Sequence, residues 1–313
     1  MAQEAFHTEQ QKSRTMTAAT ASQEARSGQD PNSLAFAFVQ ELARELSHGK
    51  VDLPSIPDVA MQVRMVLADE NATIDRVVRV TGSEPVLAAT VLRMANSVAF
   101  NTSGKPVTDL RASINRIGYN VVRTAAISFA LAQLRRSAEL KSIRHELEGL
   151  WEHGTHVAAI SYVLAKRCTN RNPDEALLTG LLHNIGKLYI LTRMVKHKEL
   201  FADSETLQSI MRDWHAHVGS AILENWQMPD EVCEAVRDHE DTMRTHRGAA
   251  DLTDIVMASV VMSQVAMADG AMHPGLQQLK AFRSLGLDIE KSQLVISEMH
   301  EEIAALRQAL SMG

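Results

Sequence analysis

The stretch LLHNIGKLYI, residues 181–190, places a histidine and an asparagine inside an otherwise apolar run. On a helix, Asn184 would lie in line with Leu177, Leu181 and Leu188, on a buried stripe. A buried amide without a hydrogen-bond partner costs on the order of 1 to 3 kcal/mol, so this pair needs partners or a bound ion. His183 and Asn184 are therefore the first candidate site residues.

The composition of the 313-residue chain favours a globular helical protein. Hydrophobic residues make up 45% of the sequence and aromatic residues 4%, and apolar positions recur three and four residues apart. The sequence therefore predicts an all-α fold. Helices are expected to begin at Pro57 or Asp58 and at Pro229, and LGLDIEKSQLVISEMHEEIAALRQAL is expected to form one terminal helix.

The net charge of -6 gives no basic field that would hold nucleic acid or an anionic membrane. No apolar run approaches the ~20 residues of a membrane span, so no membrane insertion is expected. The cysteines, Cys168 and Cys233, are isolated from each other and suggest a reducing, cytoplasmic location. Residues 1–33 have few side chains to bury and are expected to form a disordered or weakly helical tail.

Histidines recur at intervals through the second half of the chain. A single histidine on an apolar helix face is more commonly a hydrogen-bonded core residue than a ligand. Here, however, four histidines follow one another in the segments LWEHGTHVAAI, GLLHNIGK, HVGSAILENWQMP and DHE: His153, His183, His217 and His239. This order resembles the HD superfamily, helical metal-dependent phosphohydrolases whose ligands come from separate helices.

Upstream segments make the resemblance more specific. LPSIPDVAMQV, EPVLAATVLRMANSVAF and LRASINRIGYNVVRTAAISFAL resemble the first half of the HDOD domain, an HD-related output domain of bacterial signalling proteins. The resemblance runs from about Leu53 to about Ala250 and implies a two-lobed helical fold. We expect a lead-in helix over 34–52, an N-terminal helical lobe over 53–140, and an HD-like lobe with C-terminal helices over 141–313.

The resemblance also assigns the positions of a former metal site. The residues that fall there are His153, His183, Asn184, His217, Asp238, His239 and Ser259. Asn184, Asp238 and Ser259 depart from the family's metal-binding pattern. Because asparagine offers only a neutral oxygen where an HD enzyme has a carboxylate, no catalytic residue and no cofactor are expected.

The alternative at this position is a single divalent metal ion held by His153, His183 and His217, since imidazoles suit zinc or nickel. Without metal, we expect Asn184 to donate hydrogen bonds to one or more of these histidines. The former metal site would then be a polar network in the core.

A second candidate site is a series of basic residues near the junction of the lobes. They could bind an anion or an acidic partner, although a solvated helix face is the favoured explanation. The residues are Arg111, Arg116, Arg123, Arg135 and Arg136, followed by Lys141 and Arg144.

Two functions are consistent with these features. The resemblance implies a non-catalytic regulatory module that acts through interaction with other signalling proteins. The alternative is a metal-dependent phosphohydrolase or cyclic-dinucleotide phosphodiesterase of HD type. Asn184 favours the first, and no residue pattern identifies a bound cyclic dinucleotide.

Overall fold

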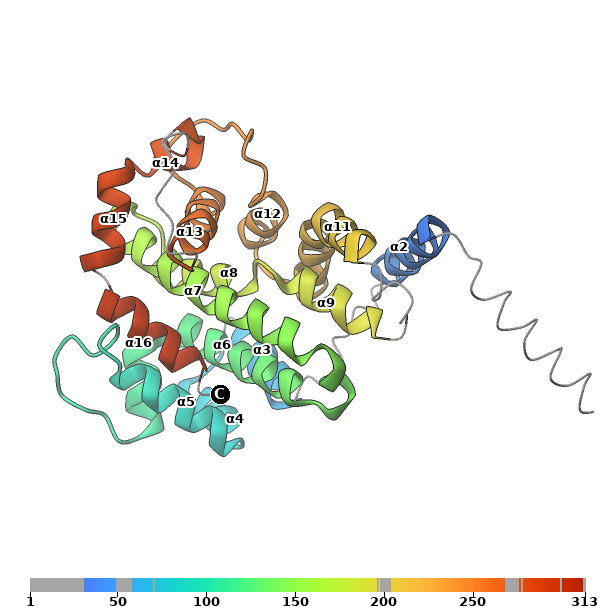
Figure 1. Ribbon diagram of the computed structural model, residues 1–313. Helices are drawn as coiled ribbons and strands as arrows, with labels where there is room; N and C mark the ends of the chain where they lie inside the picture. The colour runs from blue at the N-terminus through green and yellow to red at the C-terminus, as the bar shows by residue number, and fades with distance from the viewer. Residues whose placement is uncertain are drawn as a thin grey trace, which may run out of the picture.

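The computed structural model describes residues 31–48, 58–69, 71–195, 197, 204–267, 276, 278–298 and 300–311. Within these ranges the chain is helical and contains no strand, which confirms the predicted all-α class (Figure 1). No helix in this part of the chain combines the length and the apolar content that crossing a membrane requires. The predicted tail over 1–33 lies mostly outside the described residues.

The helices follow one another with short connections. Helix α2 (Pro31–Ser47) falls largely in the range of the expected lead-in helix. The range of the expected first lobe contains α3 (Asp58–Ala68), α4 (Ile74–Gly82), α5 (Pro85–Asn96) and α6 (Leu110–Arg136). A 3₁₀ turn, η1 (Ala138–Ile143), leads into α7 (Arg144–Cys168), α8 (Pro173–Leu182), α9 (Ile185–Met194), α11 (Ser204–Asn225), α12 (Asp230–Asp238) and α13 (Leu252–Met267). The last helices are α14 (Lys280–Ser284), α15 (Ile289–Glu298) and α16 (His300–Ser311).

Local sequence explains several of these boundaries. Thr73 caps α4 by accepting a hydrogen bond from the backbone N–H of Arg76. Pro85 occupies the first turn of α5, where a missing N–H costs nothing. The long helix α6 contains Gly118 at φ 74°, a left-handed conformation that favours glycine, and the helix bends there.

Helix α7 forms the centre of the molecule. It packs against α6, α8, α9, α13 and α16, and in Figure 1 it lies between α11 to α13 on one side and α3 to α6 on the other. Its residues from Gly154 to Ala165 are all buried. The rigid placement of α7 matters for the site because its first half carries His153 and His156.

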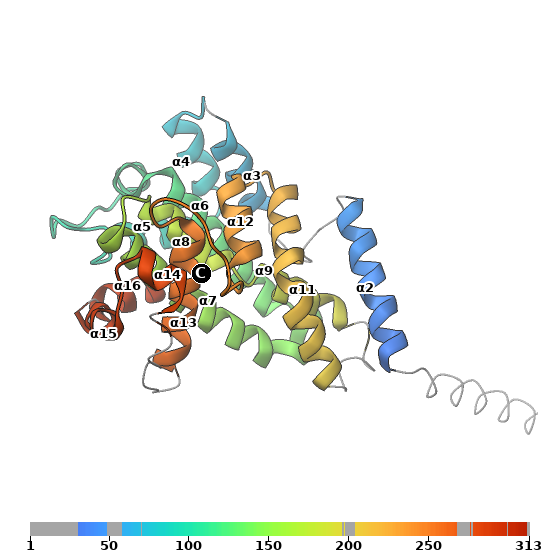
Figure 2. The same cartoon turned by 90° about the horizontal axis from the view of Figure 1, so that it is seen from above.

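The first and last described helices pack against different parts of the fold. Helix α2 packs against α11 at the edge of the molecule (Figure 2). Helix α16 packs against α5, α6 and α7, so a helix from the end of the described chain contacts both expected lobes. The buried Ser128 hydroxyl of α6 donates a 2.7 Å hydrogen bond to the Leu310 carbonyl, and Lys166 pairs with Glu302 at 2.6 Å.

Two expectations about helix continuity are wrong. The stretch over 181–190 is not one helix, because α8 ends at Leu182 and α9 begins at Ile185, with His183 and Asn184 in the turn. The C-terminal stretch is likewise two helices, α15 and α16, and not one. Apolar periodicity predicts helices well but does not register a tertiary contact that forces the chain to turn.

Candidate functional site

Four histidines from four separate regions of the chain form a continuous row in the core. The His153 ring lies edge-on to the His183 ring, with centroids 5.2 Å apart. His183 lies 5.3 Å from His239, and His239 lies 5.4 Å from His215. We call these four residues the histidine cluster.

The backbone holds three members of the cluster in one tautomer. His183 Nδ1 is 2.7 Å from the Gly180 carbonyl and His239 Nδ1 is 2.7 Å from the Val236 carbonyl. His215 Nδ1 is 2.6 Å from a carbonyl one turn earlier, that of Met211. Because a carbonyl can only accept, each Nδ1 carries a proton and each Nε2 of a neutral ring presents a lone pair.

The Nε2 atoms of these rings are buried without a hydrogen bond. The side chains of His183, His215 and His239 are 1%, 0% and 2% exposed. Their Nε2 atoms have no hydrogen-bond partner among the described residues. A buried polar atom in this state costs on the order of 1 to 3 kcal/mol, so the structure retains an arrangement that packing alone does not favour.

Burial favours the neutral form of three members of the cluster, His153, His183 and His239. Loss of hydration lowers the pKa of His239 to about 4 and the pKa of His153 to about 4, and it lowers the pKa of His183 well below its usual value. Neighbouring histidines add to the effect for His183 and His239, and the charge of Lys187 adds to it for His153, since like charges in contact repel each other. Neutral imidazole is the form that binds a metal ion.

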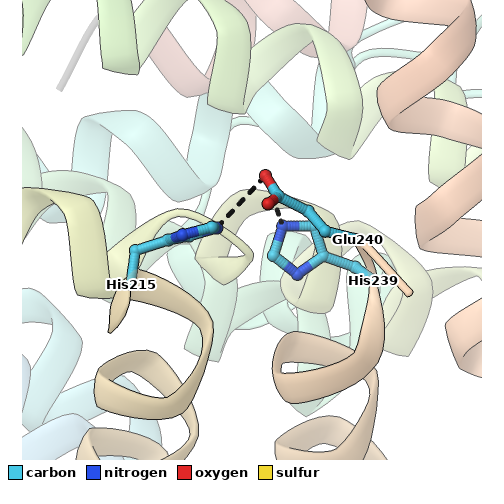
Figure 3. A group of neighbouring side chains, drawn as sticks. All are labelled: His215, His239 and Glu240. Carbon is cyan, nitrogen blue, oxygen red and sulfur yellow. Dashed lines mark ion pairs between the residues drawn. The ribbon is translucent and has the colours of Figure 1, made fainter. Parts of the chain in front are cut away.

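Glu240 is the carboxylate of the site. Its Oε1 atom lies 3.3 Å from His215 Nε2 and 3.9 Å from His239 Nε2 (Figure 3). The contact with the His215 ring, followed by the charge of Lys187 at 3.3 Å, lowers the pKa of Glu240 to about 2. Glu240 is therefore ionised throughout the physiological range.

A close helix crossing brings these residues together. A Cβ atom on Gly186 would lie 1.9 Å from the His215 carbonyl oxygen and 2.7 Å from the Gly219 nitrogen. Only a residue without a side chain allows α9 and α11 to approach so closely. The crossing places the start of α9, which follows His183, against the part of α11 that carries His215.

At the His153 end of the cluster, the histidines contact Ser263 of α13. The Ser263 hydroxyl lies 3.3 Å from His153 Nδ1 and 3.2 Å from His156 Nδ1. Burial, followed by the charge of Arg307, lowers the pKa of His156 to about 4. This end is a hydrogen-bonded part of the core and differs from the end where Nε2 atoms have no partner.

Three of the residues assigned to the site from the sequence lie elsewhere, and a nearby residue takes the place of each. His217 is exposed, and His215 occupies the cluster in its place. Asp238 pairs with the adjacent Arg237 at 2.9 Å and makes no contact with the histidines, whereas Glu240 does. Ser259 donates to the Ile255 carbonyl, and it is Ser263, one turn later, that reaches the histidines.

Asn184 does not form the expected network. Its Oδ1 atom is buried and has no hydrogen-bond partner in the described part of the chain, and no hydrogen bond joins it to a histidine there. The reason is the turn between α8 and α9, which directs Asn184 toward a cavity beside Leu181 and Trp151. The hydrogen bonds expected from Asn184 to the histidines are therefore not formed among the described residues.

The basic series is not one patch. Arg111 pairs with Asp75, while Arg116 and Arg123 donate to backbone carbonyls, including that of Leu67. Positions 111 and 135 lie on one bent helix, on the order of 30 Å apart at 1.5 Å per residue. Most of these arginines hold helices of the first lobe together.

The donor set fits one metal ion of the zinc or nickel type. Ligand atoms of His215, His239 and Glu240 all lie within 4.8 Å of one another, and His183 packs against His239. Neutral Nε2 atoms held by Nδ1 hydrogen bonds to carbonyls are the usual state of metal-binding histidines. The fit therefore involves His215, His239 and Glu240, not the expected set of His153, His183 and His217.

A family comparison places this geometry in context. The model of the HDOD domain matches residues 53–242, more than half of the chain. The chain belongs to the HDOD domain family. This assignment confirms the resemblance drawn from the ANS and IGYNVVR segments of the first lobe and from the histidine order of the second.

Solved structures similar to this HDOD protein agree in fold. One is a protein of Shewanella amazonensis SB2B provisionally named a metal-dependent phosphohydrolase, with 24% identity and a TM-score of 0.71, covering 89% of this chain and 99% of the other. Another is a provisionally named signal transduction protein of Marinobacter aquaeolei VT8, with 19% identity and a TM-score of 0.59, covering 91% of this chain and 67% of the other. Similarity at this level of identity shows the fold alone.

A curated relative of the HDOD chain is an uncharacterized protein of Treponema pallidum (strain Nichols), 23% identical over 215 residues. The match covers 64% of this chain and 40% of that protein, so the chain spans less than half the length of its relative.

Three residues of the HDOD site were missed, namely His215, Glu240 and Ser263, and the position of His215 could have been read from the sequence. His215 lies in line with Met211, Val218 and Ile222 on the apolar stripe of α11, whereas His217 lies off it. Glu240 follows the C-terminal residue of α12, and its direction depends on how the chain leaves that helix. No sequence pattern indicates that direction.

Proposed function

We propose that this HDOD protein is a regulatory module that acts by binding other signalling proteins and does not hydrolyse phosphate esters. The observation that carries the proposal is the chemistry beside His183. The residue in the acidic ligand position is Asn184, which borders a separate cavity. Among the described residues, Glu240 is the carboxylate that contacts the histidine cluster.

One carboxylate is too few for the chemistry of a two-metal phosphohydrolase. Hard divalent cations prefer oxygen ligands, and a pair of them needs carboxylates that bridge or anchor both ions. Glu240 is also engaged by Lys187, which competes for its charge. The family and a relative named for signal transduction support a regulatory role in the same direction.

A second function is favoured by one observation, the unpartnered Nε2 atoms of the cluster. His215, His239 and Glu240 would hold a single ion, which when bound would polarise a phosphoryl oxygen or lower the pKa of a water molecule. Lys187 borders a groove of about 410 Å³ beside Glu240 and would position an anionic substrate there. The Shewanella relative is named for such an activity.

Turnover assays with matched variants distinguish the two functions. Purified protein is incubated with Mn²⁺, Ni²⁺ or Zn²⁺ and with p-nitrophenyl phosphate, bis-p-nitrophenyl phosphate or cyclic di-GMP. The regulatory proposal expects the same low background for the wild type, His239→Ala and the control His217→Ala. Turnover that is lost in His239→Ala and kept in His217→Ala would establish the hydrolase instead.

A further inference from the structure

A small cavity lies where α6, α7 and the α8–α9 turn meet, outside the histidine cluster. Its volume is about 40 Å³. One water molecule needs roughly 10 to 15 Å³ by this measure, so the space holds several non-hydrogen atoms. Leucines form most of its wall, among them Leu131, Leu147 and Leu188.

Three polar side chains that line this cavity have buried atoms without a hydrogen bond. They are Trp151 at Nε1, Arg135 at Nε and Asn184 at Oδ1. Trp151 and Asn184 are each 7% exposed. Since buried polar groups are nearly always satisfied, three orphans around one cavity indicate a missing binding partner.

The charge of Arg135 indicates which chemical class of ligand the cavity would bind. Its guanidinium stacks on the Trp151 ring at 4.4 Å from the centroid and makes no ion pair with any described residue. Burial lowers the pKa of Arg135, while the more distant Glu148 and Glu152 act against this shift. A partly buried cation stacked on an aromatic ring, with no counter-ion in contact, favours an anion.

We propose that this cavity binds a small carboxylate with a short apolar body. The carboxylate would accept hydrogen bonds from Arg135 and Trp151, with the Asn184 amide turned so that its NH₂ group donates as well. The apolar body would lie against the leucines. One cation and a leucine wall suit a single negative charge better than the doubly charged phosphate.

The position of the cavity means that a bound ligand would contact several helices at once. Arg135 belongs to α6, Trp151 to α7, and Asn184 directly follows His183. A bound carboxylate would therefore join α6 to α7 and α9, next to the histidine cluster. That regulatory consequence rests on the proposed function, whereas binding itself does not.

Calorimetric titration of the full chain tests the proposal. The probes are acetate, butyrate and benzoate, with butyramide and inorganic phosphate as comparisons. Butyrate or benzoate is expected to bind the wild type with a Kd below about 10 mM and about tenfold more tightly than butyramide. Arg135→Gln should weaken binding about tenfold or more, and the matched control Arg136→Gln, at an exposed neighbour, should not change it.

A second variant keeps the test decisive if Arg135→Gln does not fold. Leu131→Phe fills the space without removing the charge and should also abolish binding. The proposal is overturned if no carboxylate of the series binds, if phosphate binds better than butyrate, or if Arg136→Gln weakens binding as much as Arg135→Gln. It is also overturned if a folded Leu131→Phe protein binds as the wild type does.

Discussion

The crossing of α9 and α11 at Gly186 allows a quantitative test of how the histidine cluster is held. A Cβ atom at this position would lie 1.9 Å from the His215 carbonyl oxygen, and ordinary contact begins at 3.4 Å. The helices must therefore separate by about 1.5 Å to accept Gly186→Ala, and neither contacting group is a flexible side chain.

The expected cost follows from two opposing terms. Overpacking of a core costs about 1 to 3 kcal/mol, and two backbone contacts place this site at the upper end. Replacing a helical glycine by alanine returns about 0.5 to 1 kcal/mol. We therefore expect Gly186→Ala to lower the free energy of unfolding by about 2 kcal/mol, or more if the separation empties neighbouring contacts.

Gly154→Ala is the matched control, because it makes the same substitution beside the same cluster. The nearest atom to its Cβ would be the Leu181 carbonyl oxygen at 3.6 Å, an ordinary contact. This variant should be stabilised by about 0.5 to 1 kcal/mol. Urea unfolding followed by far-ultraviolet circular dichroism measures both; if the two variants differ by less than about 0.5 kcal/mol, the close crossing does not hold the cluster.

Three further predictions concern other parts of the fold. Acidification should destabilise the metal-free protein. The pKa of His239 is lowered to about 4 in the folded state, so the unfolded chain binds an extra proton below about pH 6.5. The free energy of unfolding should therefore fall by on the order of 2 kcal/mol between pH 7 and pH 5 for this residue alone, as measured by urea unfolding at the two pH values. An unchanged midpoint between these pH values would contradict the burial argument. Asn184→Leu should be neutral or stabilising by up to about 1 to 3 kcal/mol, because it removes an unpaired buried amide, and a lower melting temperature would show that the amide has a partner in solution. Ser128→Ala should lower the free energy of unfolding by about 1 kcal/mol, because the Leu310 carbonyl loses its buried hydrogen-bond donor. In thermal melting, this variant should lose clearly more stability than Ser103→Ala, a control at an exposed site.

The sequence predicts the fold class well, because apolar periodicity and helix starts are local properties. The start of α12 after Pro229 and the buried stripe of α3 both follow from neighbouring residues. The histidine order also indicates the right region of the chain for the site. These features need no knowledge of which helices cross.

The finer placement of the site depends on tertiary contacts. Asn184 lies in an apolar run that reads as one helix, and the run gives no sign of the close approach of Gly186 to α11 or of the turn before it. Glu240 lies beyond the end of α12, where direction is set by the following loop. His215 alone could have been chosen from the sequence, since it lies on the apolar stripe that His217 leaves.

The hydrogen bond from Ser128 to Leu310 has a consequence for how the molecule assembles. The two residues are 182 positions apart, so forming the contact closes a very long loop. Loop closure of this length costs on the order of 4 to 5 kcal/mol of chain entropy, which a single hydrogen bond does not offset. Helix α16 should therefore dock only after α5, α6 and α7 have formed a surface to receive it. Until it docks, the apolar surface along these three helices faces water, and partly folded chains would be prone to associate through that surface.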